Sequence, residues 1–431
     1  MSARLLITNA RQIVQITESA DIRFLKGIDA DRIKILEDND ARLALLISDG
    51  IIADLGLFKE VKERNDLSDV EIIDAQKGVI LPGLVDAHSH PVFAGDRVHE
   101  FAMKLAGATY LEVQAAGGGI HFTTSATRAA TENDLYQDFK KIANQMLASG
   151  TTTLEAKSGY GLETSTEMKM LKVLERVNRE GPLEISGTFC GAHAVPRGTD
   201  EHTQTHLIAG EMLDLIRKCK ENGELKCVEN IDVFCEKGNF NVENTERILL
   251  AGAKMGLKGN FHAEELSCLH SAEMGARLQV QAMSHLEEIS DDGIKQMAQS
   301  GSVAVLLPST AFLLRLTPPP ARKMINEGVI VALGSDFNPN AWCPAMAAIM
   351  HMACVTMRLS LAEALSAATI NSAHSIGRGA THGSLHKGRV GDLLILKVPK
   401  WEHLIYRFAA HNTIISHVVK RGNIVYKNEN V

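Results

Sequence analysis

Length, composition and charge narrow the class of protein before any motif is considered. The chain has 431 residues, enough for a barrel of about 250 to 300 residues and an accessory domain. Hydrophobic residues make up 45% and charged residues 23% of the sequence, which excludes disordered and fibrous classes. The formal net charge of −7 argues against nucleic-acid binding, because a nucleic-acid binder needs a basic face to neutralise phosphates.

The sequence carries no pattern for export or membrane insertion. Its first residues, MSARLLITNARQIVQI, lack the apolar segment and cleavage site of a secretory signal, and no apolar run is long enough to cross a membrane. The seven cysteines form no C-x-x-C pair, so neither a disulfide framework nor a zinc knuckle is expected. We therefore expect a cytoplasmic protein with no membrane partner.

The first eighty residues are expected to contribute short antiparallel strands. Within them, Ala44–Ile52 contains two apolar runs separated by Asp49-Gly50. This dipeptide between apolar runs is typical of a tight β-hairpin turn.

The central part of the chain alternates between short apolar runs and amphipathic stretches. The stretches Asp134–Leu147 and Glu211–Lys220, for example, have apolar residues at helical spacing. Eight β-then-α repeats predict a (β/α)₈ barrel, a TIM-like α/β fold with its active site at the C-terminal ends of the strands. An open doubly wound sheet would need a Gly-rich phosphate loop after its first strand, and the sequence has none there. The apolar runs are Leu84–Ala87, Thr152–Glu155, Ile185–Cys190, Ile231–Cys235, Leu257–His262, Gln281–His285, Ser302–Leu307 and Val329–Leu333.

The C-terminal end returns to short β-rich runs. A Gly422-Asn423 turn is expected before the last of these runs, which are Asp392–Leu396, His417–Val419 and Ile424–Tyr426. Strands at both ends of the chain predict one small β-sandwich built from both termini. The expected division is residues 1–80 and 381–431 for the sandwich and residues 81–380 for the barrel.

Residues able to bind a metal stand at the ends of four of the predicted barrel strands. Because residues two apart on a strand point to the same face, both imidazoles of the H-x-H motif after the first strand can face one ion. One divalent ion, zinc or iron, is expected, since imidazole and carboxylate ligands suit both. An ion with an open position lowers the pKa of a bound water toward neutrality. The expected ligands are His88, His90, His262 and Asp336.

His285, at the end of the sixth strand, is expected just outside these ligands. There it would hydrogen-bond to the nucleophile or to the nascent oxyanion. The structural alternative is a buried histidine that the backbone satisfies.

Motifs around these residues resemble the amidohydrolase superfamily: PGLVDAHSH, FHAEE, SHLEE and GSDFNP. Within that superfamily, GDRVHEF, YLEVQAAGGGI, TTTLEAKSGYGL and GAHAVP resemble the imidazolonepropionase family of histidine degradation. The similarity extends from about Ala44 to near the C-terminus. It implies hydrolysis of the cyclic amide 4-imidazolone-5-propanoate to N-formimidoyl-L-glutamate with a single metal ion. It also favours an ordinary ion-pairing role for Lys157 over a carbamylated lysine that bridges two metals.

Such a substrate is a small anion, so its pocket needs a cation for the carboxylate. Arg97, on the first βα loop, is the candidate because its guanidinium can bind a carboxylate through two hydrogen bonds. The structural alternative is a surface pair with Glu100 or Asp96. Tyr160 is expected either to donate to the ring or carboxylate or to pack under its loop.

The remaining candidates concern the ring and the proton. His193 is expected at the ring carbonyl, where it would stabilise the developing oxyanion. Either Glu265 or Asp336 is expected to carry a proton to the leaving nitrogen, and Glu265 is also a candidate ring contact. The resemblance implies product and substrate contacts at Asn338 and Asn340.

Two other functions fit part of the pattern. A purine or pyrimidine deaminase would share the fold and the metal site, but a neutral base needs no carboxylate clamp such as Arg97. A non-catalytic barrel scaffold would be expected to lack ligands, and none is missing from the sequence. A small-molecule substrate and a homodimer are the expected partners.

Overall fold

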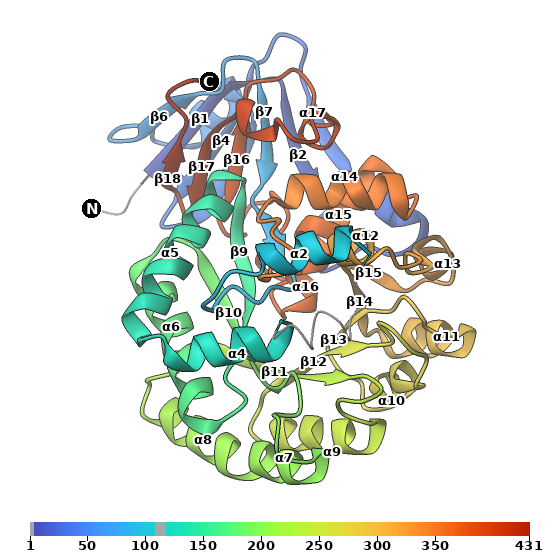
Figure 1. Ribbon diagram of the computed structural model, residues 1–431. Helices are drawn as coiled ribbons and strands as arrows, with labels where there is room; N and C mark the ends of the chain where they lie inside the picture. Colours follow the sequence, from blue (N-terminus) through green and yellow to red (C-terminus); the bar gives the residue numbers. More distant parts are fainter. Residues whose placement is uncertain (1–3, 108–117) are drawn as a thin grey trace.

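The computed structural model describes residues 4–107 and 118–431, and eight parallel strands form its centre. Figure 1 shows these strands below the sheets that contain the two ends of the chain. Each apolar run picked out in the sequence overlaps one of the strands, which confirms the predicted (β/α)₈ barrel. The hydrogen-bonded order follows the chain: β8 (Leu84–Asp86), β9 (Thr151–Lys157), β10 (Glu184–Ala192), β11 (Val228–Cys235), β12 (Lys258–Ala263), β13 (Ala282–His285), β14 (Val303–Leu306) and β15 (Ile330–Leu333).

The barrel closes between β8 and the residues that follow β15. The Asp336 N–H donates to the His88 carbonyl at 2.9 Å, and the His90 N–H donates to the Phe337 carbonyl at 2.7 Å. Closure therefore joins the two segments that carry three of the predicted metal ligands, although they lie about 250 residues apart in the chain.

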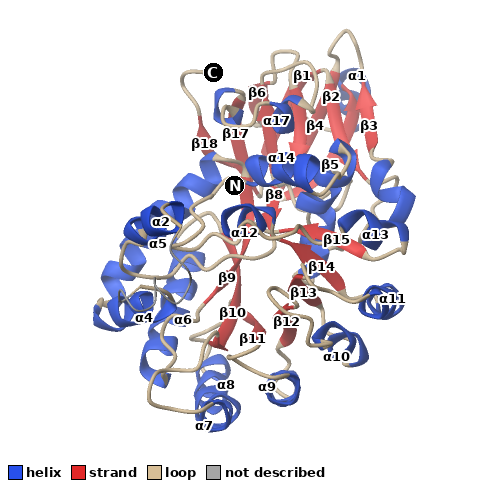
Figure 2. Ribbon diagram, turned by 45° about the vertical axis from the view of Figure 1, so that its right-hand side comes forward, coloured by secondary structure: helices blue, strands red, loops and turns tan. Residues whose placement is uncertain are grey.

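Helices surround the barrel (Figure 2). Within α5, Leu135, Phe139, Ile142 and Met146 are buried at helical spacing, and Thr131 begins the helix with a capping box. The two predicted helical stretches lie in α5 and in η2–α8. The helices of this layer are α2 (Val98–Leu105), α4 (Ile120–Ala129), α5 (Glu132–Ala148), α6 (Thr164–Glu180), α7 (Glu201–Leu207), π-helical η2 (Ile208–Met212), α8 (Leu213–Glu221), α9 (Val242–Ala253), α10 (Ser271–Arg277), α11 (Asp291–Ser300), α12 (Pro308–Leu314), α13 (Ala321–Asn326), α14 (Met346–Thr356), α15 (Leu361–Ser366), π-helical η3 (Ala367–Asn371) and α16 (Ser372–Ser375).

The two ends of the chain form two further sheets, as expected for a sandwich. The expectation that all these strands pair antiparallel was wrong, because β1 pairs with β6 and β2 with β7 in parallel. A four-stranded sheet has the order β5–β4–β1–β6, and a six-stranded sheet with the order β18–β17–β16–β7–β2–β3 combines strands from both ends. Apolar side chains of both sheets form one core between them, including Leu5, Ile47, Ile80 and Leu393. The strands are β1 (Arg4–Ala10), β2 (Gln12–Ile16), β3 (Lys34–Glu37), β4 (Leu43–Ser48), β5 (Ile51–Leu57), β6 (Glu71–Asp74), β7 (Val79–Pro82), β16 (Leu393–Leu396), β17 (Ile415–Lys420) and β18 (Asn423–Lys427).

Two hairpin turns in these sheets test the expected turn positions. Asp49 and Gly50, between β4 and β5, have φ angles of 54° and 76°, as a tight hairpin turn requires. Between β17 and β18 the positive angles fall at Arg421 and Gly422, at 48° and 77°. The predicted Gly422-Asn423 turn was therefore one residue too late, because Asn423 already belongs to β18.

None of the helices in the described residues is long and apolar enough to cross a membrane. The boundaries proposed at residues 81 and 381 stay a prediction. The short helices are η1 (Gly27–Asp31), α1 (Phe58–Arg64), α17 (His403–Tyr406) and η4 (His411–Thr413).

A cluster of ion pairs joins the sandwich to the barrel. Glu184, at the start of β10, lies 3.0 Å from Lys420 Nζ and 2.8 Å from Arg378 Nε. Lys420 also lies 2.5 Å from Asp392, and these two side chains are only 7% and 4% exposed. Burial alone would raise the pKa of Glu184. The hydrogen bond from His382 and the charge of Lys420 nevertheless hold this pKa well below its usual range.

Replacing Lys420 with Met should destabilise the protein, because the Asp392 carboxylate then stays buried without this cation. We expect the free energy of unfolding to fall by about 3 kcal/mol, seen in denaturant titration and as a lower Tm. Lys34→Met is the matched control, because Lys34 pairs with Glu18 at the surface. The control should change the free energy of unfolding by less than about 0.5 kcal/mol. Equal effects in the two variants would contradict a structural role for the cluster.

Candidate active site

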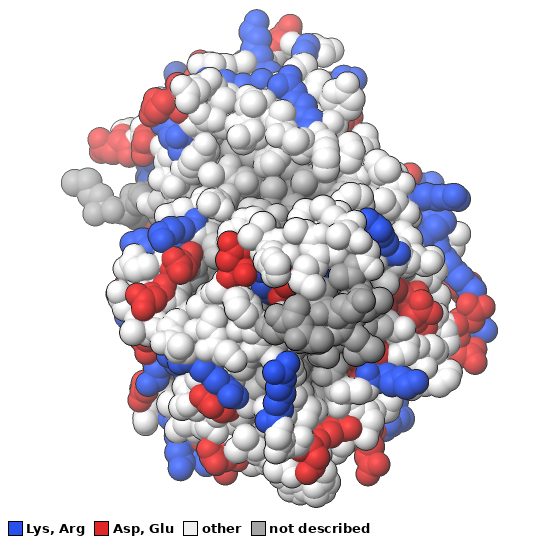
Figure 3. All heavy atoms as spheres, viewed as in Figure 1, with Lys and Arg blue, Asp and Glu red and all other residues white. Residues whose placement is uncertain are grey.

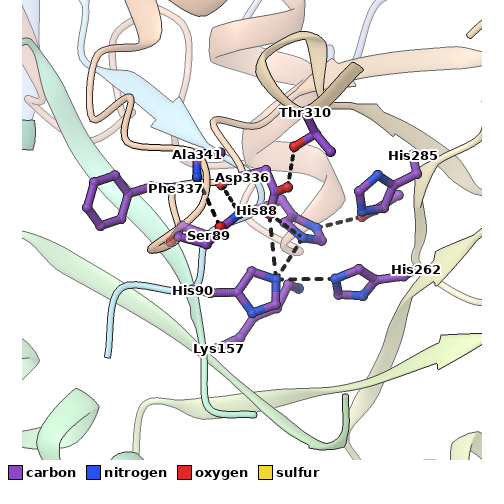
Figure 4. Close-up of polar contacts among 12 residues, drawn as sticks. His88, Ser89, His90, Lys157, His262, His285, Thr310, Asp336, Phe337 and Ala341 are labelled. Carbon is purple, nitrogen blue, oxygen red and sulfur yellow. Dashed lines mark hydrogen bonds and ion pairs between the residues drawn. The ribbon is translucent and has the colours of Figure 1, made fainter. Parts of the chain in front are cut away.

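The four side chains assigned to a metal meet at the carboxyl ends of the barrel strands. His88 and His90 follow β8, His262 lies on β12, and Asp336 follows β15. Figure 4 shows the three imidazoles and the carboxylate directed toward one another. All four residues are buried, so the strand ends bring distant parts of the sequence into one enclosed cluster.

The nitrogen atoms of three imidazoles are spaced for one metal ion. His90 Nε2 lies 3.2 Å from both His88 Nε2 and His262 Nε2. Asp336 Oδ1 lies 3.5 Å from His88 Nε2 and 3.7 Å from His90 Nε2. A tetrahedral ion with bonds of about 2.0–2.1 Å requires ligand atoms about 3.3 Å apart. The three imidazoles therefore fit one divalent ion, and Asp336 lies beside two of them. Nitrogen and oxygen donors suit either zinc or iron.

Buried partners orient two of the imidazoles. Ser284 Oγ lies 2.8 Å from His88 Nδ1, and Asp232 Oδ1 lies 2.9 Å from His262 Nδ1. Because the Asp232 carboxylate can only accept, His262 Nδ1 carries the proton and Nε2 keeps its lone pair for a metal. Burial lowers the pKa of both His88 and His90 well below the usual value, so neutral imidazoles are available as ligands.

A buried lysine stabilises the ionised form of Asp232. Lys157 Nζ, on β9, lies 2.8 Å from Glu155 Oε1 and 2.7 Å from Asp232 Oδ2, and all three side chains are fully buried. Burial alone would lower the pKa of Lys157, but the charges of Asp232 and Glu155 raise it. Burial alone would raise the pKa of Asp232, but His262 and Lys157 lower it to about 2. Lys157 is thus an ion-pairing lysine, and its ammonium keeps Asp232 ionised as the acceptor for His262.

Asp336 and His285 occupy strained backbone positions. Their φ angles are 45° and 77°, in the left-handed region that residues with a side chain rarely adopt. The Thr310 hydroxyl donates to Asp336 Oδ2, which leaves Oδ1 toward the histidines. Burial raises the pKa of Asp336, and the hydrogen bond from Thr310 partly offsets this effect. Strain of this kind clusters at functional sites, where the surrounding structure maintains it.

His285 and Glu265 lie beside the predicted ligands. The His285 ring stacks on His262 with the ring centroids 5.1 Å apart, and its Nε2 lies 3.6 Å from Glu265 Oε2. Among the described residues His285 Nδ1 has no hydrogen-bond partner, so the backbone does not satisfy this ring. Burial, with the charges of Glu287 and Asp336, raises the pKa of Glu265 well above its usual value. The raised pKa favours the protonated form of Glu265.

His193 and Tyr160 form a wall beside His90. The rings of His193 and His90 stack with centroids 4.6 Å apart, and Tyr160 lies 5.2 Å from His193. His193 Nδ1 donates to the Gly159 carbonyl at 3.0 Å, so its Nε2 keeps a lone pair. Burial, with the charge of His262, lowers the pKa of His193 to about 3. His193 is therefore neutral, and its Nε2 accepts a hydrogen bond but cannot donate one.

Arg97 comes directly before α2, and its charge acts on Tyr160. Burial raises the pKa of Tyr160, and the charge of Arg97 partly offsets this rise. Arg97 Nη2 donates to Glu100 Oε2 at 2.7 Å, which is the pairing considered as the structural alternative. The two side chains are only 11% and 5% exposed, however, so this pair is not at the surface. Among the described residues Arg97 Nε has no partner.

Asn338 and Asn340 lie in the loop after β15. Asn338 Oδ1 accepts from the N–H groups of Asn340 and Ala341 at 2.7 and 3.1 Å, and Asn338 Nδ2 donates to the Asp336 carbonyl at 2.7 Å. The Asn338 amide thus shapes the loop. Asn340 Oδ1 accepts from Lys104 Nζ. The predicted ligand contacts of both asparagines stay predictions, and most of the YLEVQAAGGGI motif lies outside the described residues.

Sequence reasoning missed the residues that orient the predicted ligands. Asp232, Ser284 and Thr310 each bond to one of them. The available signal was a polar residue inside or directly after an apolar strand run, as with Asp232 on β11. Such a residue can equally face solvent, and only the neighbouring strand shows what it contacts.

The chain was compared with known proteins. The amidohydrolase family model matches residues 79–425. A Nematostella vectensis protein named "Probable imidazolonepropionase" is 52% identical over 98% of this chain and 99% of its own length. A Homo sapiens protein of the same name is 50% identical over 98% of each chain. The solved structure of E. coli guanine deaminase aligns with a TM-score of 0.71 over 99% of this chain and 100% of that chain, at 15% identity, which shows the fold alone.

The chain therefore belongs to the amidohydrolase family, whose members are metal-dependent hydrolases. Within that family its curated relatives at about half identity, over nearly the full length of both chains, carry the name imidazolonepropionase. The fold, the clustered histidines and Asp336 agree with this membership.

Replacing Asp232 with Asn should weaken metal binding, because the amide can present its N–H₂ group to His262 and no longer fixes the tautomer. We expect the metal affinity to fall by about 10- to 100-fold, measured by competition with a chelator. The matched control is Asp292→Asn on the exposed surface of α11, which should leave affinity unchanged. A thermal melt of the metal-free proteins separates this effect from misfolding. Equal chelator resistance in wild type and Asp232→Asn would contradict the orienting role.

Proposed function

We propose that this protein hydrolyses 4-imidazolone-5-propanoate to N-formimidoyl-L-glutamate, the reaction of an imidazolonepropionase. The observation that carries the proposal is a buried cluster of three histidines spaced for one metal, with Asp336 beside two of them, together with the largely buried cation Arg97. Hydrolysis of a ring that carries a carboxylate tail needs a metal for the ring and a cation for the tail. Relatives of the same name that are about 50% identical over the full chain support it.

We assign the metal to His88, His90, His262 and Asp336, with zinc and iron equally suited to the donor set. A divalent ion at this position supplies Lewis acidity, which polarises a carbonyl oxygen and lowers the pKa of a water molecule. The complete donor set also speaks against a non-catalytic scaffold.

Substrate binding, stabilisation of the oxyanion and proton transfer are assigned to side chains around the metal site. We assign ring recognition to His193, whose Nε2 can accept a ring N–H. An oxyanion needs a hydrogen-bond donor, and His193 Nε2 cannot donate. We therefore assign the stabilisation of the oxyanion to His285 instead of His193. The raised pKa of Glu265 favours its protonated form, so Glu265 can give a proton to the leaving ring nitrogen, with Asp336 as the other carrier. Arg97 and Tyr160 hold the carboxylate tail.

The proposal is tested by following the ultraviolet absorbance of imidazolone-propanoate with purified protein. Loss of the chromophore with N-formimidoylglutamate appearing by mass, abolished by a chelator and restored by zinc or iron, is the expected result. Metal-replete protein that leaves the substrate unchanged would overturn the substrate assignment while leaving the metal centre in place. Turnover of a purine or pyrimidine by such protein would favour a deaminase.

Replacing Glu265 with Gln should lower kcat by about 10²- to 10⁴-fold, because the amide cannot transfer a proton. KM and metal content should change little, since Gln keeps the size and polarity of the side chain. The control is Glu288→Gln, an exposed residue just beyond β13, which should retain full activity. A Glu265→Gln enzyme with wild-type kcat would remove Glu265 from the proton pathway and leave Asp336.

We also propose a homodimer and a cytoplasmic location. Large apolar side chains around one surface cavity are exposed, as expected for an interface between subunits: Val98, Phe101, Phe312, Trp342 and Phe408. The seven cysteines are free, which fits a reducing compartment. Light scattering after size exclusion should give twice the chain mass of 46.8 kDa, and Phe312→Glu should reduce it to one chain. A monomeric wild type would contradict the dimer.

A further inference from the structure

The backbone of Asp336 is strained, although its carboxylate must face the imidazoles. Its φ angle of 45° lies in the left-handed region, which costs a residue with a side chain free energy. Figure 4 shows the carboxylate directed toward the imidazoles and contacted by Thr310. Because Thr310 bonds to the side chain, it does not fix the backbone. Other groups must therefore maintain the left-handed conformation at Asp336.

The side chain of Ser335 bridges the strained residue. The Phe337 N–H donates to Ser335 Oγ at 3.1 Å, so one hydroxyl spans the backbone from the residue before Asp336 to the residue after it. The Ser335 carbonyl accepts from the Ser309 hydroxyl at 2.6 Å. Ser335 and Phe337 are fully buried, so water does not compete for these bonds. Hydrogen bonds thus hold the backbone on both sides of Asp336.

A buried carboxyl group connects Ser335 to the first barrel strand. The Ser335 hydroxyl donates to Asp86 Oδ2 at 2.5 Å, and the Ser335 N–H donates to Asp86 Oδ1 at 2.8 Å. The same Oδ1 accepts from the His88 N–H at 3.3 Å. Asp86, the last residue of β8, is only 1% exposed. One side chain therefore bonds to both segments that carry the assigned ligands His88 and Asp336.

These side-chain bonds act in addition to barrel closure. Backbone hydrogen bonds already join the same two segments, from the Asp336 N–H to the His88 carbonyl and from the His90 N–H to the Phe337 carbonyl. A serine hydroxyl that accepts from the N–H two residues ahead forms a local turn, which competes with a continued strand. The bond between Ser335 and Phe337 is of this kind, so it acts on the conformation of Asp336 itself.

We propose that Asp86 and Ser335 are positioning residues, which hold the strained backbone of Asp336 so that its carboxylate is in place before the metal binds. Asp86 acts through Ser335, and neither is assigned as a ligand. Because the fold prepares this conformation, metal binding does not have to offset its strain. The inference rests on the metal ligands assigned in the proposed function and names what keeps one of them in place.

The test replaces Ser335 with Ala and measures metal affinity by competition with a chelator. Loss of the hydroxyl frees the Asp336 backbone, so we expect the affinity for zinc to fall by about 10- to 100-fold. Ser302→Ala is the matched control, because Ser302 is also buried in the barrel and donates to the Val280 carbonyl at 2.7 Å. The control should lose similar stability in a thermal melt of metal-free protein but keep the wild-type affinity.

Cobalt substitution adds a readout that a merely structural role would not move. The visible absorption of Co²⁺ depends on the number and geometry of its ligands, so it should change in Ser335→Ala and not in Ser302→Ala. Asp86→Asn is the conservative variant. Its amide oxygen can still accept from the two N–H groups, and its N–H₂ group can donate to Ser335 Oγ, so it should keep most of the affinity and the wild-type spectrum.

Three outcomes would overturn the inference. Wild-type affinity and spectrum in Ser335→Ala mean that Asp336 keeps its position without this hydroxyl. Equal losses of affinity in Ser335→Ala and Ser302→Ala mean that buried serines only stabilise the barrel. A loss in Asp86→Asn as large as in Ser335→Ala means that the charge of Asp86, and not its hydrogen bonds, is what matters. If Ser335→Ala does not fold, Ser309→Ala replaces it, because it removes only the bond to the Ser335 carbonyl, and unchanged affinity there would contradict the inference.

Metal affinity and the cobalt spectrum need no substrate, which separates this inference from the proposed function. A wild type that binds metal but does not hydrolyse imidazolone-propanoate removes the substrate assignment, and the affinities of the variants still decide the inference. A wild type that binds no metal overturns the inference together with the ligand assignment.

Discussion

The Asp232 carboxylate lies between two buried nitrogens, His262 Nδ1 and Lys157 Nζ, and the geometry of the candidate metal centre depends on this arrangement. An isolated buried charge would be costly, so Lys157 and the two carboxylates around it stabilise one another. These residues come from β9, β11 and β12. The barrel must therefore hold its strand register for the carboxylate to keep both the hydrogen bond from His262 and the ion pair with Lys157. That register also orients the His262 imidazole toward the other histidines of the candidate site.

The sandwich contributes to the same geometry from the other end of the first barrel strand. β7, in the six-stranded sheet, runs through Gly83 directly into β8 and the H-x-H motif. A side chain at Gly83 would meet Thr152 of β9 at 2.2 Å, so only glycine permits this close approach. The position of His88 and His90 is thus set by both domains. On the face that Figure 3 displays, acidic and basic side chains are interspersed.

Burial gives the residues beside the metal centre different protonation states. It raises the pKa of Glu265, which favours the protonated carboxyl, and lowers the pKa of His193 to about 3, which leaves the imidazole neutral. A neutral acid can give a proton to a nitrogen, and a neutral imidazole can accept a hydrogen bond. Burial therefore shifts the two pKa values in opposite directions, because it disfavours the charged form, which is the deprotonated form of a carboxyl and the protonated form of an imidazole.

The sequence by itself determined the barrel, the strands at both ends and the candidate ligands. Apolar runs of strand length must be buried, and a parallel barrel places whatever follows each run at one end, so His88, His262 and Asp336 could be grouped before any contact was known. Only the tertiary structure decided the partners of these residues. Asp232 and Ser284 orient imidazoles that lie 30 and 196 residues away in the chain, and Lys104 reaches Asn340 across 236 residues. Periodicity reports which face a residue occupies, whereas a hydrogen bond depends on which other element packs against that face.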